Sequence, residues 1–162
     1  SQQRYQGCYA ESARRPEYRD CSRRPWIMPM KLLMRPSVLV IEDSASVRRL
    51  IDVCLRPTGA EIRSAEDGLL GLQAAWAAVP DVIVLDIGLP GLDGWGVLSR
   101  LRADDRTAEV RVLVLTAHAQ PEMADRAAAD GADAFMTKPF RPDDLRETIE
   151  TLVADSRAAA SA

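Results

Sequence analysis

Residues 82–94 read Val-Ile-Val-Leu-Asp-Ile-Gly-Leu-Pro-Gly-Leu-Asp-Gly, an apolar run that ends in Asp86 and passes into a stretch rich in glycine and proline. A short apolar run bounded by such residues is typical of a strand that is buried on both faces. The turn-forming residues that follow end the strand. Asp86 is therefore expected at the carboxyl end of a buried strand, beside a turn.

Three further apolar runs are also followed by polar side chains. These are Glu42 and Asp43 after residues 38–41, Thr116 after residues 112–115, and Lys138 shortly after residues 134–136. Open α/β sheets bind their ligands at the carboxyl edge of the strands, so these groups are expected to share one site. Three carboxylates there would repel one another unless a cation lay among them. Mg²⁺ fits, because it is held by carboxylates together with phosphate oxygens, and the set indicates phosphoryl chemistry.

Strand and helix patterns alternate from Ser37 onward. The predicted strands are 37–42, 61–65, 81–86, 111–116 and 133–137, and the predicted helices are 45–56, 68–78, 94–103, 121–130 and 142–154. Asp43 or Ser44 can cap the start of the first helix, Gly59 follows the end of that helix, and Gly131 follows the end of the fourth. Five such units predict an α/β fold with a parallel sheet, right-handed crossovers and helices on both faces.

The 162 residues suit one domain, and no apolar run approaches the length that spans a bilayer. Charge divides the chain unevenly: residues 1–36 hold eight basic and three acidic residues, whereas residues 37–162 hold 13 and 21. We expect a basic, disordered extension over 1–35, one domain over 36–155 and a disordered tail over 156–162. The acidic domain lacks the clustered cations that nucleic acid binding needs.

The basic extension has two readings. Met34 lies immediately before the first strand and would make a natural start, in which case the upstream residues are a start-site artefact. The alternative is a basic arm for an anionic partner. Cys54 lies on an apolar helical stripe and is expected to be a buried hydrophobe, while Cys8 and Cys21 define no disulfide framework. A cytoplasmic location is the default expectation.

These motifs together resemble the receiver domain of two-component response regulators. The matching stretches are 38–44, 84–94, 115–117 and 131–140, within a resemblance that covers roughly residues 36–154. Five motif positions match in type, order and place on the strands, whereas any one of them alone would be a weak signal. The resemblance implies a flavodoxin-like, doubly wound (βα)5 fold with strand order 2-1-3-4-5.

The resemblance also implies roles for the polar residues. Asp86 would be the phosphoacceptor, since a carboxylate forms an acyl phosphate when the leaving group is good. Asp43, Asp86 and the backbone carbonyl of Gly88 would bind Mg²⁺, with Glu42 acting partly through water. Lys138 would pair with one phosphate oxygen and Thr116 would hydrogen-bond another.

Further positions take their meaning from the same resemblance. It implies a cis peptide between Lys138 and Pro139 that would aim the lysine into the pocket, and an aromatic switch at Phe135. Lys138 and Phe135, three residues apart on a predicted strand, are expected on opposite faces. Gly88 and His118 would tune access of water to the acyl phosphate, although an exposed loop is the simpler reading of His118. Trp95 is most simply a packing residue.

The resulting hypothesis is a stand-alone receiver that takes a phosphoryl group from a sensor histidine kinase or a histidine phosphotransfer protein. It would catalyse only its own phosphorylation and dephosphorylation, and its output would be a partner protein. A fragment of a larger regulator or hybrid kinase is the main alternative. A phosphatase with an aspartyl-phosphate intermediate is disfavoured, because such enzymes carry a second Asp where Gly88 stands. A nucleotide or flavin module would need a glycine-rich phosphate cradle after the first strand. A pseudo-receiver that only binds partners would have lost an acid or the lysine.

Overall fold

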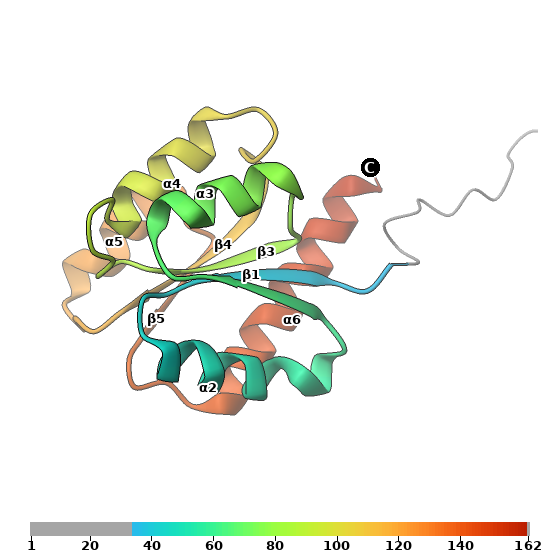
Figure 1. Cartoon of the computed structure of the whole chain (residues 1–162), viewed down its shortest axis with the longest axis horizontal. Coiled ribbons are helices and arrows are strands. Elements are labelled where there is room, and N and C mark those ends of the chain that lie inside the picture. The colour runs from blue at the N-terminus through green and yellow to red at the C-terminus, as the bar shows by residue number, and fades with distance from the viewer. Residues whose placement is uncertain (1–33, 162) are drawn as a thin grey trace, which may run out of the picture.

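The fold is described from a computed structural model, which covers residues 34–161. The expectations for residues 1–33 and for Ala162 lie outside this range. Within it, strands and helices alternate along the chain and form a sheet with helices on both sides (Figure 1). The predicted α/β class is confirmed.

The described residues form a five-stranded sheet in the order β2-β1-β3-β4-β5, and every pair of neighbours is parallel. The strands are β1 (Ser37–Ile41), β2 (Glu61–Ala65), β3 (Val82–Asp86), β4 (Arg111–Thr116) and β5 (Ala134–Thr137). This is the strand order that the family resemblance implied. In the register, Ile41 pairs with Leu85, and Asp86 pairs with Leu115. The ends of β1, β3 and β4 therefore meet at one edge of the sheet.

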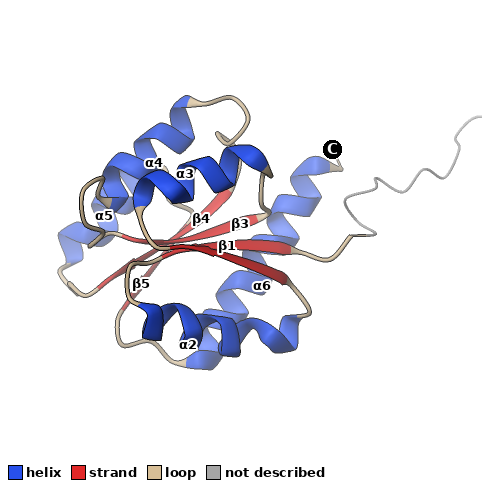
Figure 2. Cartoon of the chain, viewed as in Figure 1, coloured by secondary structure: helices blue, strands red, loops and turns tan. Residues whose placement is uncertain are grey.

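Helices follow each strand. They are α2 (Ala45–Leu55), α3 (Gly68–Ala77), α4 (Gly94–Ala103), α5 (Pro121–Ala129) and α6 (Pro142–Ala160), with a short 3-10 turn η1 (Arg56–Thr58) after α2. Figure 2 shows α3, α4 and α5 on one side of the sheet and α2 and α6 on the other. Within residues 34–161, no helix combines the length and the apolar composition needed to cross a membrane.

Side-chain oxygens fix where three helices begin. Ser44, Asp67 and Asp93 accept hydrogen bonds from backbone N–H groups at the starts of α2, α3 and α4. Such caps satisfy donors that the first helical turn leaves without a partner. Of the two candidates for capping the first helix, Ser44 makes the contact. Gly59 and Gly131 have φ values of 69° and 91°, which suits glycine at the ends of helical segments.

Alternate residues of the central strands feed two hydrophobic cores. Leu39, Ile83 and Val114 face the helices α3, α4 and α5, whereas Val40, Val84 and Leu113 belong to the core under α2 and α6. Every residue of β3 is buried, as expected for a strand covered on both faces. This burial holds the carboxyl end of β3 rigidly at the centre of the sheet edge.

The last helix differs from the sequence-based expectation. The helix predicted over 142–154 extends to Ala160, so most of the expected tail is helical. Its added turns carry alanine, the strongest helix former, and bury Ser156. Arg157 donates a 2.6 Å hydrogen bond to the carbonyl oxygen of Met34 and lies 3.9 Å from the carboxylate of Asp81. The extension thus ties the end of the domain to its beginning.

The close approach of α3 to β1 can be tested at Gly71. A Cβ atom at this position would lie 2.5–2.8 Å from three side-chain atoms of Ile41, which is fully buried. Gly71→Ala should therefore lower the free energy of unfolding by about 1–2 kcal/mol in urea denaturation, because overpacking outweighs the gain in helix propensity. Gly88→Ala is the control, since its Cβ would lie at an ordinary 3.6 Å. A Gly71→Ala protein as stable as the wild type would show that this packing is not tight.

Candidate functional site

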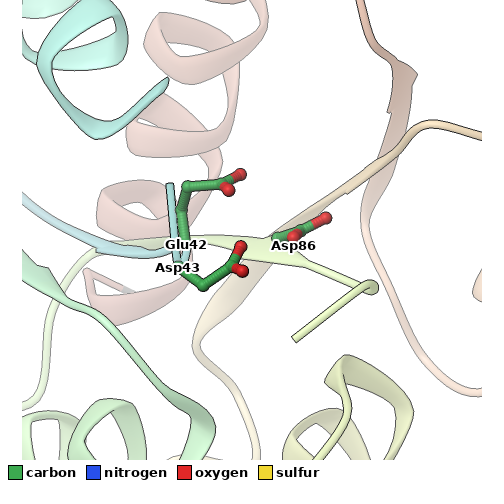
Figure 3. Close-up of side chains that lie close together, drawn as sticks. All are labelled: Glu42, Asp43 and Asp86. Atoms are coloured by element: carbon green, nitrogen blue, oxygen red, sulfur yellow. The ribbon is translucent and has the colours of Figure 1, made fainter. Parts of the chain in front are cut away.

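Three carboxylates converge where β1 and β3 end. Oxygen atoms of Glu42, Asp43 and Asp86 all lie within 4.8 Å of one another. Figure 3 shows the three side chains directed toward the same space, Glu42 and Asp43 from the end of β1 and Asp86 from the end of β3. The acidic pocket predicted from the sequence is therefore present.

Glu42 is the most deeply placed of the three acids, with 1% of its surface exposed. One carboxylate oxygen accepts a 3.1 Å hydrogen bond from the backbone N–H of Ser44. The other accepts a 2.7 Å hydrogen bond from the ammonium group of Lys138. The backbone N–H of Glu42 donates to the carbonyl oxygen of Ala65 on β2, which carries the sheet pairing one residue beyond β1. Glu42 is thus fixed by both its backbone and its side chain.

Lys138 brings a positive charge to this cluster from the far end of the chain. Its Nζ atom lies 2.7 Å from Glu42 and 3.1 Å from Asp86. The Lys138–Pro139 peptide bond is cis, as the resemblance implied. The expectation that Lys138 shares a strand with Phe135 is wrong, because β5 ends at Thr137. The Pro139 nitrogen has no hydrogen to donate to a ladder, although the N–H of Lys138 still bonds the carbonyl of Thr116 at 2.7 Å.

The charges of the cluster do not balance. Burial raises the pKa of Glu42, and the nearby Asp86 carboxylate raises it further against the hydrogen bonds from Lys138 and Ser44. The pKa of Lys138 is also raised, because its contacts with Glu42 and Asp86 outweigh the opposing effect of burial. The effect of Asp86 on Glu42 and the raised pKa of Lys138 both have the sign expected of a site with more negative than positive charge. Added positive charge would therefore be favourable here.

The turn after Asp86 closes tightly through backbone contacts of Gly88 and Gly94. The backbone N–H of Gly88 donates a 3.2 Å hydrogen bond to the Asp86 carboxylate. The N–H of Gly94 bonds the carbonyl oxygen of Ile87 at 3.2 Å, and any Cβ at Gly94 would collide with the backbone carbonyl of Asp86. Glycine at position 94 is thus required for α4 to begin directly beside the acid. The residues after β3 thus contact both the side chain of Asp86, through the Gly88 N–H, and its backbone carbonyl, against which Gly94 lies.

Thr116 ends β4 and is buried. Its hydroxyl oxygen accepts a 3.1 Å hydrogen bond from the backbone N–H of His118, so its own proton remains available for donation. The His118 side chain is exposed, which matches the simpler of its two readings. Phe135 is partly buried against the core under α3, α4 and α5. Trp95 packs against the same core, and the Arg126 guanidinium from α5 lies 4.1 Å from the centre of its ring.

The donor set fits a hard divalent cation. It consists of carboxylate oxygens that lie close enough to share one ion, with an exposed opening at Asp43. Carboxylates with remaining positions for water or phosphate oxygens are the usual environment of Mg²⁺. The excess negative charge supplies a physical reason for a cation to bind. Neutral nitrogen or sulfur ligands, which softer metals prefer, do not occur in this cluster.

Sequence reasoning missed one residue of the site, Arg48 on α2. One of its guanidinium nitrogens, Nη1, donates to the carbonyl oxygens of Glu42 at 2.7 Å and of Asp43 at 2.9 Å. A signal was available, because a cation near the amino end of a helix is disfavoured by the helix dipole and needs a local reason. The partners of such a cation are backbone atoms, which no residue pattern reveals.

Known proteins resemble this chain over the residues that carry the acidic cluster. The family model of the response regulator receiver domain matches residues 38–150. The chain is 36% identical over 118 residues to the DNA-binding dual master transcriptional regulator RpaA of Synechocystis, covering 73% of this chain and 49% of that protein. It is 28% identical to sporulation initiation phosphotransferase F of Bacillus subtilis, covering 73% of this chain and 94% of that protein. It thus spans about half the length of RpaA and several other curated relatives.

A solved structure extends the likeness to the fold. The chemotaxis response regulator CheY4 of Vibrio cholerae superposes with a TM-score of 0.69 at 30% identity, covering 74% of this chain and 99% of that one. Receiver domains are signalling modules of two-component systems rather than classical enzymes, and they interact with histidine kinases or phosphotransferases. The acidic cluster of Glu42, Asp43 and Asp86 lies within the matched residues.

The repulsion among the three carboxylates can be measured by neutralising Asp43. In metal-free buffer at neutral pH, Asp43→Asn should raise the free energy of unfolding by about 1 kcal/mol, because it removes one of three crowded like charges. Urea denaturation in EDTA measures this change, with the exposed loop residue Asp105→Asn as the control.

The stabilisation should shrink as the pH falls toward the raised pKa of Glu42. A raised pKa means that the folded protein binds the proton more tightly than the unfolded chain, so protonation relieves the repulsion in the wild type. An Asp43→Asn protein less stable than the wild type in EDTA would contradict an electrostatic conflict at this site.

Proposed function

Because the chain belongs to the response regulator receiver domain family, we propose that Asp86 accepts a phosphoryl group from a phosphohistidine. The donor would be a sensor histidine kinase or a histidine phosphotransfer protein. The observation that carries this proposal is the position of Asp86, a buried carboxylate at the end of the central strand, 3.1 Å from the ammonium of Lys138. That ammonium is placed to meet negative charge arriving at Asp86.

In the transfer, an Asp86 oxygen attacks phosphorus, the bond between phosphorus and the histidine nitrogen breaks, and the imidazole leaves with the bonding electron pair. Asp43, Asp86 and the backbone carbonyl of Gly88 would hold Mg²⁺, with Glu42 reached through water. When bound, the ion supplies positive charge against the transferred phosphoryl oxygens. Positioning and charge neutralisation supply most of the catalysis in phosphoryl transfer.

The side chains around Asp86 would then receive the product. Lys138 would exchange its contact with Glu42 for a phosphoryl oxygen, and the Thr116 hydroxyl would donate to another. A bound phosphoryl group carries about −1.5 to −2 charges at neutral pH, which is enough to favour these new contacts. The residues that follow Thr116 lead directly into α5, which begins at Pro121. A shift of Thr116 would therefore be passed on to α5.

The output would be a change of the surface formed by α5, β5 and α6, read by a partner protein. Phe135 on β5 is partly buried beneath this surface and is proposed to change its packing when Thr116 moves. The domain itself is not proposed to bind nucleic acid. The receiver is proposed to act alone. The alternative is that it forms part of a larger regulator or hybrid kinase, because several relatives are about twice as long. Domain bounds of 36–155 remain part of the proposal.

Labelling with a small phosphodonor tests the acceptor. Acetyl phosphate with Mg²⁺ should add one phosphoryl group to the wild type, detected by intact mass, and Asp86→Asn should add none. Asp93→Asn is a matched control, because Asp93 is the next acid along the chain and Asn also caps helices well. EDTA should abolish the labelling. An Asp86→Asn protein labelled as fully as the wild type would refute the assignment.

The proposed path of the signal from Asp86 to the output surface is tested by substituting Lys138 and Phe135 one at a time. Lys138→Ala should keep some labelling, because Asp86 and the cation ligands remain, yet lose the response at the output surface. Phe135→Ala should be labelled almost normally and should alter only that surface or the binding of partners. Amide NMR shifts of α5, β5 and α6 with and without beryllofluoride measure the response. A full wild-type response in Lys138→Ala would exclude the lysine as the relay.

A further inference from the structure

Arg48 on α2 contacts the backbone of the loop that carries Glu42 and Asp43. It is the fourth residue of α2, and its Nη1 atom bonds the carbonyl oxygens of Glu42 and Asp43 at 2.7 and 2.9 Å. These two carbonyls are consecutive and belong to two of the three residues that form the carboxylate cluster. One guanidinium group therefore bonds the peptide groups on both sides of the Asp43 Cα atom, Glu42–Asp43 and Asp43–Ser44.

The other hydrogen bonds of this loop hold the neighbours of Asp43: the Glu42 N–H bonds the carbonyl of Ala65, and the Ser44 N–H bonds the Glu42 carboxylate, both at 3.1 Å. The Ser44 hydroxyl that caps α2 lies 3.5 Å from the N–H of Val47, at the long end of hydrogen-bond distances, and it also bonds Ser46 at 2.9 Å. The side chain of Asp43 is exposed. The position of the Asp43 carboxylate therefore depends largely on the direction in which its own backbone is held.

We propose that Arg48 is a positioning residue for the cation site, holding the Glu42–Asp43 backbone so that the Asp43 carboxylate stays beside Asp86. The proposal rests on the proposed function, because it concerns the affinity of the same site for Mg²⁺. Arg48 touches neither the ion nor the phosphoryl group in this role. It acts through the backbone that carries the ligands.

Two effects of Arg48 on cation binding have opposite signs. Its positive charge repels a cation, so its removal would tighten Mg²⁺ binding if charge alone mattered. Arg48 is partly exposed and its guanidinium already bonds two carbonyl oxygens, so water and salt screen this repulsion and its effect is expected to be less than about fivefold. Loss of a group that orients metal ligands typically weakens binding by roughly tenfold or more. Positioning is therefore expected to prevail, and the direction of the change separates the two effects.

The test is an NMR titration of the full chain with MgCl₂. Arg48→Ala should weaken Mg²⁺ binding roughly tenfold and shift the amide signals of Asp43 and Ser44 already in the metal-free protein. Arg48→Lys keeps the charge but not the planar guanidinium fork, and its Mg²⁺ affinity should lie between those of the wild type and Arg48→Ala. Arg49→Ala, which removes an exposed charge from the neighbouring position, should bind like the wild type. A purely structural role would lower stability in urea without moving the Mg²⁺ affinity.

Affinity equal to or tighter than the wild type in Arg48→Ala would overturn the inference. If that variant does not fold, Arg48→Gln decides in the same way, since it removes the charge and keeps a shorter donor. A wild-type protein that binds no Mg²⁺ would refute the proposed function, whereas a binding wild type with an unaffected Arg48 variant would refute the role of Arg48 alone.

Discussion

Repulsion among three carboxylates at one sheet edge is the constraint on which this molecule depends. Glu42, Asp43 and Asp86 place their oxygens within 4.8 Å of one another, and a single ammonium group from Lys138 contacts two of them. Proteins tolerate such crowding where a bound cation or an incoming group offsets it. The pKa of Glu42 is raised mainly by burial and further by the Asp86 carboxylate, and that of Lys138 is raised by its contacts with both acids, against the effect of its own burial. The fold holds in place an arrangement that favours added positive charge.

The parallel sheet makes that arrangement possible. Neighbouring parallel strands end at the same edge, so acids that are far apart in sequence become neighbours. Burial of β3 on both faces prevents Asp86 from relaxing away, and Gly94 lets α4 begin against its backbone. Lys138 arrives from beyond the last strand, with its N–H bonded to Thr116 at the end of β4. The residues proposed to bind the cation and the phosphoryl group therefore lie next to Thr116, from which the chain leads into α5.

Much of this could be predicted from the sequence because it depends on local patterns. Continuous apolar runs that end in acids located the buried strands and the pocket, and the motif residues implied the strand order. The far end of α6 was missed because its alanines, which favour a helix, were read as a tail, and because Arg157 contacts Met34 and Asp81, which are distant in the sequence and which no local pattern predicts. Arg48 was missed for a related reason, since its partners are carbonyl oxygens that every residue carries.

The cluster of Glu42, Asp43 and Asp86 at the sheet edge is proposed to bind a cation, and Asp86 to accept a phosphoryl group. A crystal structure of the full chain grown with Mg²⁺ and beryllofluoride tests it most directly. The account predicts beryllofluoride density on the Asp86 carboxylate, a cation held by Asp43 and Asp86, and the Lys138 ammonium turned from Glu42 toward a fluoride. An unmodified Asp86, with Lys138 still on Glu42 and the cation bound elsewhere or not at all, would contradict it.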